Sequence, residues 1–240
     1  MVDTQGTHRR LRHVGNNGID VDRLVRVRAF DRFEALLSSL TKNEQLITAP
    51  MRVIAGTYRS RILKSLKGLA LRPTSDRLRE TLFNVLAPNI AGSRFVDLFA
   101  GTGAIGIEAL SRGAAEVVFI ENHAPAATLI RRNLKSLGVN TGATILAVDA
   151  LRGLAMLAAR KNADAQAFDY VFLDPPYAAA EDYSRVLEFL GSADLLAPGG
   201  IVIAEHRRNF DLHEEAGVLR RLRFLKQGDA ALSFYRRLPL

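Results

Sequence analysis

The sequence of 240 residues contains no cysteine and no tryptophan, and only 7% of its residues are aromatic. The absence of cysteine excludes disulfide bonds, iron–sulfur clusters, cysteine-ligated zinc and thiol nucleophiles. No apolar run approaches the roughly 18–20 residues that span a bilayer, and the first twelve residues lack the apolar core of a secretory signal. We therefore expect a cytoplasmic protein. Its 48% of hydrophobic and 24% of charged residues are typical of a globular fold, and exclude a wholly disordered chain, a collagen or a coiled coil.

The net charge of +8 is distributed unevenly along the chain. Residues 51–91 carry a formal net charge of +6 and residues 219–240 carry +5, whereas residues 92–218 carry −5 and residues 1–50 carry +2. If the two basic segments meet in the fold, they form one positive face suited to a polyanion. These cations could also merely solubilise the surface, but their segregation favours a nucleic acid.

Residues 1–50 resemble an extension to a domain that follows. Apolar positions at three- and four-residue spacing predict one helix over residues 22–40, and the remainder of the extension is polar. Pro50 ends this pattern and Met51, a candidate natural start, opens a new one. We predict an N-terminal extension over residues 1–50, partly disordered or a docked helix, a basic hairpin and helix over 51–91, and the main domain over 92–240.

Short apolar runs alternate with amphipathic segments after residue 91. The predicted strands are Phe95–Phe99, Val117–Glu121, Thr144–Val148, Tyr170–Leu173, Ile201–Glu205, Leu219–Leu225 and Ala231–Arg236. The predicted helices among them are Ala104–Ser111, Ala124–Leu137, Leu151–Ala159 and Tyr183–Leu190. Before them, a small β-hairpin (Arg52–Tyr58 and Arg61–Leu63) precedes a helix that Ser75 or Asp76 caps and that ends near Leu86. This order predicts an α/β fold with a mostly parallel seven-stranded sheet and a C-terminal antiparallel hairpin.

A glycine-rich loop follows the first strand of the predicted sheet and opens a helix. Gly101, Gly103 and Gly106 spell GxGxxG, a pattern that fits NAD, FAD or S-adenosylmethionine and also a purely structural tight turn. Asp97 lies near the end of the first strand. Glu121 ends the second strand, where it could accept hydrogen bonds from ribose hydroxyls, and Asp149 follows the third, where it could hold an adenine amino group. Carboxyl ends of parallel strands share one edge of a sheet, and ligands of open α/β sheets bind there.

A second motif, Asp174-Pro175-Pro176-Tyr177, follows the fourth predicted strand. The two prolines stop helix and sheet and leave rigid carbonyl groups beside the Asp174 carboxylate. Two such oxygen acceptors and an aromatic face suit a planar substrate that bears an NH2 group. A proline-rich turn with a surface tyrosine is the alternative, and the glycine loop on the first strand argues against it.

These motifs resemble those of amino-methyltransferases that use S-adenosylmethionine. Residues 52–61, RVIAGTYRSR, and 71–84, LRPTSDRLRETLFN, narrow the similarity to the RsmD family of bacterial 16S rRNA guanine-N2 methyltransferases over residues 51–237. The resemblance implies a Rossmann-like class I methyltransferase fold and no metal. It also implies the cofactor-binding residues Asp97, Gly101, Gly103, Glu121, Asp149, Ala150, Arg72 and Thr74, and a guanine site formed by Asp174, Pro175 and Tyr177.

The implied substrate is 16S rRNA, within an assembled or assembling 30S subunit. Phosphate contacts are expected from both basic segments, at Arg52, Arg59, Arg61, Lys64, Arg223 and Arg236. Three alternatives stay open: a methyltransferase for another amino group (DNA adenine or protein glutamine), a nicotinamide oxidoreductase, and a non-catalytic RNA-binding module. The oxidoreductase hypothesis assigns no role to the Asp174 motif. The presence of Asp174 argues against a non-catalytic RNA-binding module.

Overall fold

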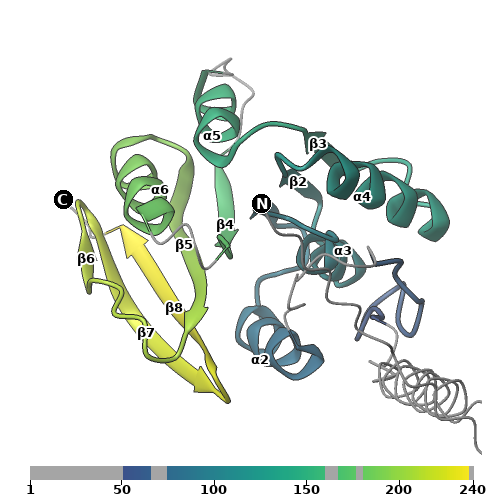
Figure 1. Cartoon of the computed structure of the whole chain (residues 1–240), viewed down its shortest axis with the longest axis horizontal. Coiled ribbons are helices and arrows are strands. Elements are labelled where there is room, and N and C mark those ends of the chain that lie inside the picture. The colour runs from purple at the N-terminus through teal and green to yellow at the C-terminus, as the bar shows by residue number, and fades with distance from the viewer. Residues whose placement is uncertain (1–50, 66–74, 160–166, 177–180, 238–240) are drawn as a thin grey trace, which may run out of the picture. The chain divides into compact units, whose positions relative to one another are not determined.

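A mixed eight-stranded sheet with the strand order β3-β2-β1-β4-β5-β8-β7-β6 organises the described part of the chain (Figure 1). The computed structural model describes residues 51–65, 75–159, 167–176 and 181–237, which belong to the unit Pro50–Leu240. Its helices are α2 (Asp76–Leu86), α3 (Ala104–Ser111), α4 (Ala124–Leu137), α5 (Ala150–Ala159) and α6 (Glu181–Ser192). Its strands are β1 (Arg94–Leu98), β2 (Glu116–Ile120), β3 (Ala143–Leu146), β4 (Phe168–Leu173), β5 (Leu196–Arg207), β6 (Glu215–Ala216), β7 (Leu219–Gln227) and β8 (Ala230–Arg237).

Strands β1 to β5 are mutually parallel, and β8, β7 and β6 continue the sheet in antiparallel pairing. This arrangement confirms the predicted α/β fold with its closing hairpin. The sheet has one strand more than predicted, because β6 contains only two residues and so short a segment has no periodicity to detect.

The two faces of the sheet bury separate hydrophobic cores. Helices α2, α3 and α4 cover one face, where Phe95 and Phe172 are buried, and α5 and α6 cover the other, where Leu98 and Leu173 are buried (Figure 1). Since successive strand residues point to opposite faces, a strand covered on both sides needs apolar residues throughout. That requirement explains the continuous apolar runs of the sequence.

Local signals determine where the helices start and stop. The Ser75 hydroxyl accepts a hydrogen bond from the Leu78 amide (3.1 Å) and so caps α2, as predicted. Helix α4 has Pro125 in its first turn and ends at Gly138, whose φ of 76° lies in the left-handed region that glycine favours. Helices α3 and α4 have the bounds that the sequence predicts.

Residues 51–64, here called the N-terminal hairpin, pair less extensively than predicted. A single antiparallel bridge joins Arg52 to Ile62, with hydrogen bonds from the Val53 amide to the Arg61 carbonyl (3.0 Å) and from the Leu63 amide to the Met51 carbonyl (2.8 Å). Turns occupy residues 55–60. The chain therefore forms a tight loop closed by one bridge rather than two regular strands.

Several predictions fall outside the described residues. They are the helix over residues 22–40 and the sites at Arg72, Thr74 and Tyr177. The predicted domain boundaries also stay predictions. Within the described ranges, none of the helices is long and apolar enough to cross a membrane.

Candidate active site

The glycine loop connects β1 to α3 at the carboxyl edge of the sheet, as predicted. Phe99, Gly101 and Gly103 have φ values of 57°, 55° and 77°, so the backbone enters the left-handed region three times within five residues. A Cβ atom added at Gly106 would lie 2.3 Å from the Phe119 ring of β2. The third glycine of the motif thus permits α3 to pack closely on the sheet, whereas Gly101 and Gly103 shape the loop.

Asp97 lies beneath this loop and is almost fully buried. Its carboxyl accepts a hydrogen bond from the Gly106 amide in α3 (2.9 Å). Burial raises the pKa of Asp97 to about 8, the Gly106 hydrogen bond opposes this rise, and the negative charge of Glu121 adds to it. Asp97 therefore connects β1 to α3 below the loop.

Glu121 shapes the loop from the neighbouring strand, a contact that the sequence did not predict. One carboxylate oxygen accepts from the Gly101 amide (2.7 Å) and the other from the His123 amide (2.7 Å). Each oxygen of an ionised carboxylate has more than one acceptor position, so Glu121 keeps capacity for a further donor. This position is compatible with the predicted ribose contact.

Asp149 and Ala150 lie at the next strand end, after β3. Asp149 is exposed, and one of its oxygens accepts from the Arg152 amide (2.9 Å), so it caps the first turn of α5. Ala150 is buried at the start of that helix. The three acids predicted at this edge therefore each contact a different loop or helix terminus.

Asp174 follows β4, the strand beside β1, and Leu173 lies opposite Leu98 in the register. Pro175 is buried and Pro176 is exposed. Burial raises the pKa of Asp174 well above its ordinary value of 3.8, and the charges of Glu205 and Asp97 add to the rise. The structure thus brings together two predicted site residues, Asp97 and Asp174.

Glu205 is a residue of this centre that the sequence analysis did not single out. Leu173 of β4 lies opposite Ala204 of β5, so the chain positions that follow, Asp174 and Glu205, are neighbours at the same sheet edge. Glu205 is 8% exposed. The available signal was a carboxylate at the end of a fifth predicted strand, the same signal that marked Asp97 and Glu121.

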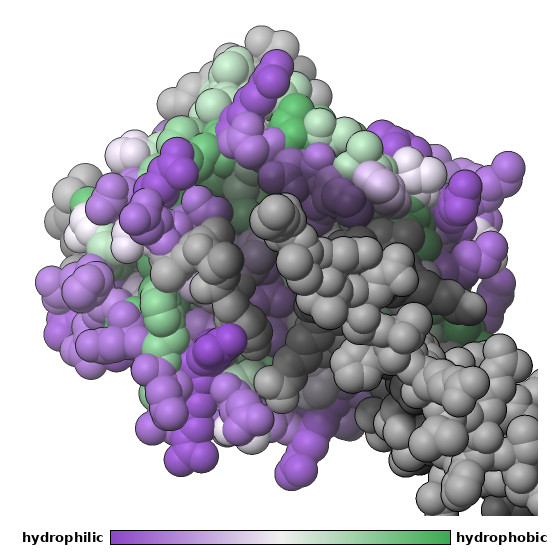
Figure 2. All heavy atoms as spheres, in the orientation of Figure 1, coloured by the Kyte–Doolittle hydropathy of each residue, from purple (hydrophilic) through white to green (hydrophobic). Residues whose placement is uncertain are grey.

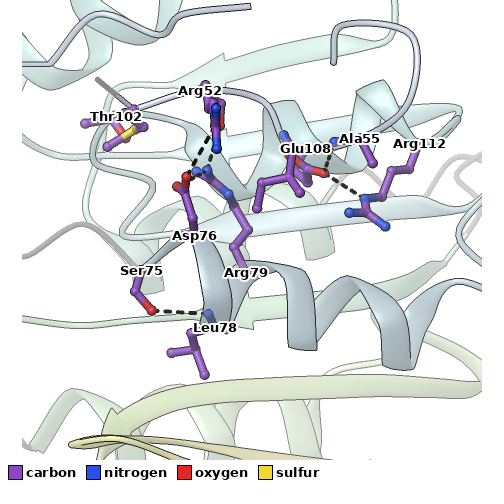
Figure 3. A network of polar contacts seen from close by, with 11 residues as sticks. Arg52, Ala55, Ser75, Asp76, Leu78, Arg79, Thr102, Glu108 and Arg112 are labelled. Atoms are coloured by element: carbon purple, nitrogen blue, oxygen red, sulfur yellow. Dashed lines mark hydrogen bonds and ion pairs between the residues drawn. The ribbon is translucent and has the colours of Figure 1, made fainter. Parts of the chain in front are cut away.

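A buried polar network fastens the N-terminal hairpin to α2 and α3 (Figure 3). The fully buried Glu108 accepts from the Ile54 amide (2.8 Å), the Ala55 amide (3.0 Å) and the Arg112 guanidinium (2.7 Å). Fully buried Arg79 donates through Nη2 to the Arg52 carbonyl (2.6 Å) and to Asp76 (2.8 Å). Arg79 belongs to the basic segment of the sequence, yet it contributes no charge to the surface.

The expected phosphate-binding cations divide into two groups. Arg59, Arg61 and Lys64 are exposed on the N-terminal hairpin, which is bonded to α3 and α4, while Arg223 and Arg236 are exposed on β7 and β8. Arg52 is exposed and lies 3.7 Å from Asp76. No hydrogen bond or ion pair among the described residues joins the N-terminal hairpin to β7 or β8. The two groups lie toward different ends of the sheet, since α4 packs at the β3 end and β8 and β7 lie toward the other end of the strand order.

Comparison with known proteins connects this geometry to a family. The family model described as Conserved hypothetical protein 95 matches residues 51–236. The chain belongs to this family. Its match begins where the sequence pattern changes, so residues 1–50 lie outside it.

Relatives of this family member carry names of RNA methyltransferases. A Bacillus subtilis (strain 168) protein, "Putative rRNA methyltransferase YlbH", is 36% identical over 187 residues, which cover 78% of this chain and 99% of that protein. "Ribosomal RNA small subunit methyltransferase D" of Haemophilus influenzae is 41% identical over 128 residues, which cover 53% of this chain and 64% of that protein. The chain thus spans slightly less than two thirds of the second relative.

Solved structures confirm the Rossmann-like methyltransferase fold. "Putative methyltransferase yhhF from Escherichia coli" matches with a TM-score of 0.67 and 30% identity over 79% of this chain and 98% of that one. An O-methyltransferase from Bacillus cereus, described in complex with SAH, matches with a TM-score of 0.56 and 15% identity over 70% of this chain and 84% of that one. The second likeness concerns the fold alone.

Proposed function

We propose that this chain transfers a methyl group from S-adenosylmethionine to the exocyclic N2 amine of a guanine in 16S rRNA. The observation that carries the proposal is the adjacency of two motifs on neighbouring strands. The glycine loop follows β1, Asp174 follows β4, and Leu98 and Leu173 are paired in the register. The names of the relatives support RNA as the substrate, and the resemblance to the RsmD family supports the guanine N2 amine.

The carboxyl edge suits the cofactor in shape and in chemistry. The three positive φ values turn the loop tightly above buried Asp97, and Glu121 stands beside Gly101 with acceptor capacity for a ribose hydroxyl. The start of α5, at Asp149 and Ala150, would flank the adenine. Arg72 and Thr74 are proposed for the methionine end. When bound, S-adenosylmethionine supplies an electrophilic methyl group.

Asp174 has the central role in the proposed reaction. The N2 lone pair of guanine is delocalised into the ring, which makes the amine a poor nucleophile. Hydrogen bonds from its two N–H groups to the Asp174 carboxylate and the Pro175 carbonyl favour a more pyramidal nitrogen. Tyr177 would stack on the base, which must be unpaired or flipped out of its helix. The new N2–carbon bond would replace the carbon–sulfur bond of the donor, with S-adenosylhomocysteine as the leaving group, and the methylated nitrogen would give up one proton to the Asp174 carboxylate. Orientation and matched electrostatics supply most of the acceleration.

A methylation assay with nucleoside analysis tests this function. The full chain would be incubated with S-adenosylmethionine labelled in its methyl group and with 30S subunits, free 16S rRNA or duplex DNA. We expect label in N2-methylguanosine of rRNA. Label in N6-methyladenine of DNA, or in glutamine of a ribosomal protein, would replace the proposed substrate. Binding of NAD in place of S-adenosylmethionine would overturn the reaction class.

A further inference from the structure

Helix α4 has a cationic surface, although it belongs to a sequence segment, residues 92–218, whose net charge is negative. Arg131, Arg132 and Lys135 are all exposed, and the helix contains no acidic residue. At 100° per residue these three side chains share one outward stripe, whereas Ile130 and Asn133 on the other side are fully buried. The surrounding segment nevertheless has a net charge of −5, because most of its acids lie elsewhere in the fold.

The cationic stripe of α4 adjoins the cations of the N-terminal hairpin. The Arg61 guanidinium donates to the Ser136 carbonyl of α4 (2.8 Å). Buried Asn133 accepts from the Lys64 amide (2.9 Å) and donates to the Lys64 carbonyl (3.1 Å). Two segments that are about seventy positions apart in the sequence thus present one surface. Figure 2 shows hydrophilic residues along the outer side of α4, at the right of the view.

Most of the cations on this surface have no balancing acid. Arg52 of the N-terminal hairpin lies 3.7 Å from Asp76. Within the described ranges, no ion pair involves the other six cations, which are Arg59, Arg61, Lys64, Arg131, Arg132 and Lys135. Elsewhere the described arginines commonly have a carboxylate partner, as Arg94 has in Glu116 at 2.8 Å. A row of unpaired cations complements the regular negative charges of a phosphate backbone.

Asn133 also fixes this surface relative to the cofactor loop. Its side-chain amide donates to the Thr102 carbonyl (3.1 Å) as well as to Lys64. One buried side chain therefore joins the glycine loop, α4 and the N-terminal hairpin. A polyanion held on the surface would occupy a defined position relative to the methyl donor.

We propose that α4 and the N-terminal hairpin together form the phosphate-binding surface for the RNA substrate, with Arg132 and Lys135 as contacts from α4. The proposal rests on the proposed function for the identity of the polyanion. Arg132 lies on the part of the stripe that is nearest to Ser136 and hence to Arg61, and Lys135 is one turn away on the same stripe. In this proposal both side chains contact RNA phosphates rather than bases, so the contacts do not depend on the RNA sequence.

The test replaces both side chains of α4 with neutral residues of similar size, Arg132→Gln with Lys135→Gln. The matched control is Arg152→Gln with Arg185→Gln, which removes the same charge from α5 and α6 on the opposite face of the sheet. Binding of the full chain to 30S subunits and to free 16S rRNA is measured without cofactor over a range of salt concentrations. Melting temperature and calorimetric S-adenosylmethionine affinity establish that all variants are folded.

We expect the α4 pair to weaken RNA binding about tenfold near 0.15 M salt and to flatten the log–log salt dependence by about 1.4–1.8 units, since each lost phosphate contact removes about 0.7–0.9. The control pair should leave the slope within about 0.3 units of wild type. Equal slopes for the two pairs would overturn the proposal. So would a wild-type chain that binds no RNA.

Binding and methylation separate the two proposals. A chain that binds rRNA through α4 but leaves no N2-methylguanosine supports the surface and contradicts the function. A chain that forms N2-methylguanosine with an α4 pair whose binding matches the control contradicts the surface and supports the function.

Discussion

The two basic regions of this protein lie at opposite ends of one sheet and differ in how their charge is compensated. At the end formed by β7 and β8, Arg220 lies 3.7 Å from Glu215, Arg221 lies 3.1 Å from Glu214, and Arg237 lies 3.9 Å from Asp194. Three of the six cations on β7 and β8 are thus paired. At the end formed by α4 and the N-terminal hairpin, only Arg52 of the seven exposed cations has such a partner among the described residues, Asp76. Glu214 and Glu215, which precede β7 in the sequence, partly neutralise the positive charge of β7. Net charge along a sequence is therefore a poor measure of net charge on a surface.

The two ends also differ in what holds them together. Buried Glu108 and Arg79 fasten the N-terminal hairpin, whereas the carboxylates of the ion pairs at the β7 end, Glu214 and Glu215, are largely exposed to solvent. A buried charge that loses its partners cannot be rehydrated, but a surface charge can. Substitutions at the two ends should consequently have effects of very different size.

The largest effect is expected for Glu108→Ala. The change leaves two backbone amides of the N-terminal hairpin and the Arg112 guanidinium without their acceptor. We expect the free energy of unfolding, measured by urea denaturation, to fall by about 3–5 kcal/mol. Glu214→Ala at the other end should cost less than about 1 kcal/mol, because its partner Arg221 has other contacts. Similar losses for both variants would remove the distinction between the two ends.

The next effect concerns catalysis at the middle of the sheet, between the two ends. Asp174→Ala should lower the turnover number by about a hundredfold or more, the scale of losing one aligned acceptor in the transition state. S-adenosylmethionine affinity should be retained, because the glycine loop and Glu121 remain in place. Near-normal methylation would mean that another group holds the amine.

A smaller effect is expected in the pH dependence of the same centre. Asp174 accepts hydrogen bonds best as a carboxylate, and its pKa is raised. The ascending limb of a plot of kcat/KM against pH should therefore lie well above pH 4. Glu205→Gln removes a neighbouring negative charge, which should lower the pKa of Asp174 and move this limb toward lower pH. A limb that stays in place would show that Glu205 does not influence Asp174.

The smallest effect is expected at the β7 end. Arg220→Gln breaks an exposed ion pair at 3.7 Å and should change the free energy of unfolding by about 0.5 kcal/mol or less. Urea denaturation at low and at high salt provides the measurement, since salt already screens the pair. A loss above about 2 kcal/mol would show that this end depends on its charges as the other end does.

Much of the fold followed from local patterns. The bounds of α3 and α4 agree with the prediction, and the structure places Gly103 and Gly138, both in the left-handed region, at the start of one and the end of the other. The bounds of β5 were predicted too short. Pro198 to Gly200 resemble a break in the sequence, and the structure has an irregularity there: Leu196 pairs with Phe168 of β4, and regular pairing resumes at Ile201 after a shift of register. Pairing with β8 then carries β5 on to Arg207. Strand β6 was not predicted, because two residues are too few to show a periodic pattern.

The sequence by itself determined the element types, the glycine loop and the acids at the strand ends, because capping, periodicity and turn chemistry act over a few neighbouring residues. Only the tertiary structure decided that Glu205 stands beside Asp174, that Arg79 is buried, and that α4 joins the N-terminal hairpin through Asn133. These are contacts between distant segments, fixed by strand register and helix packing. Burial and charge pairing depend on such contacts, so no local pattern of the chain contains them.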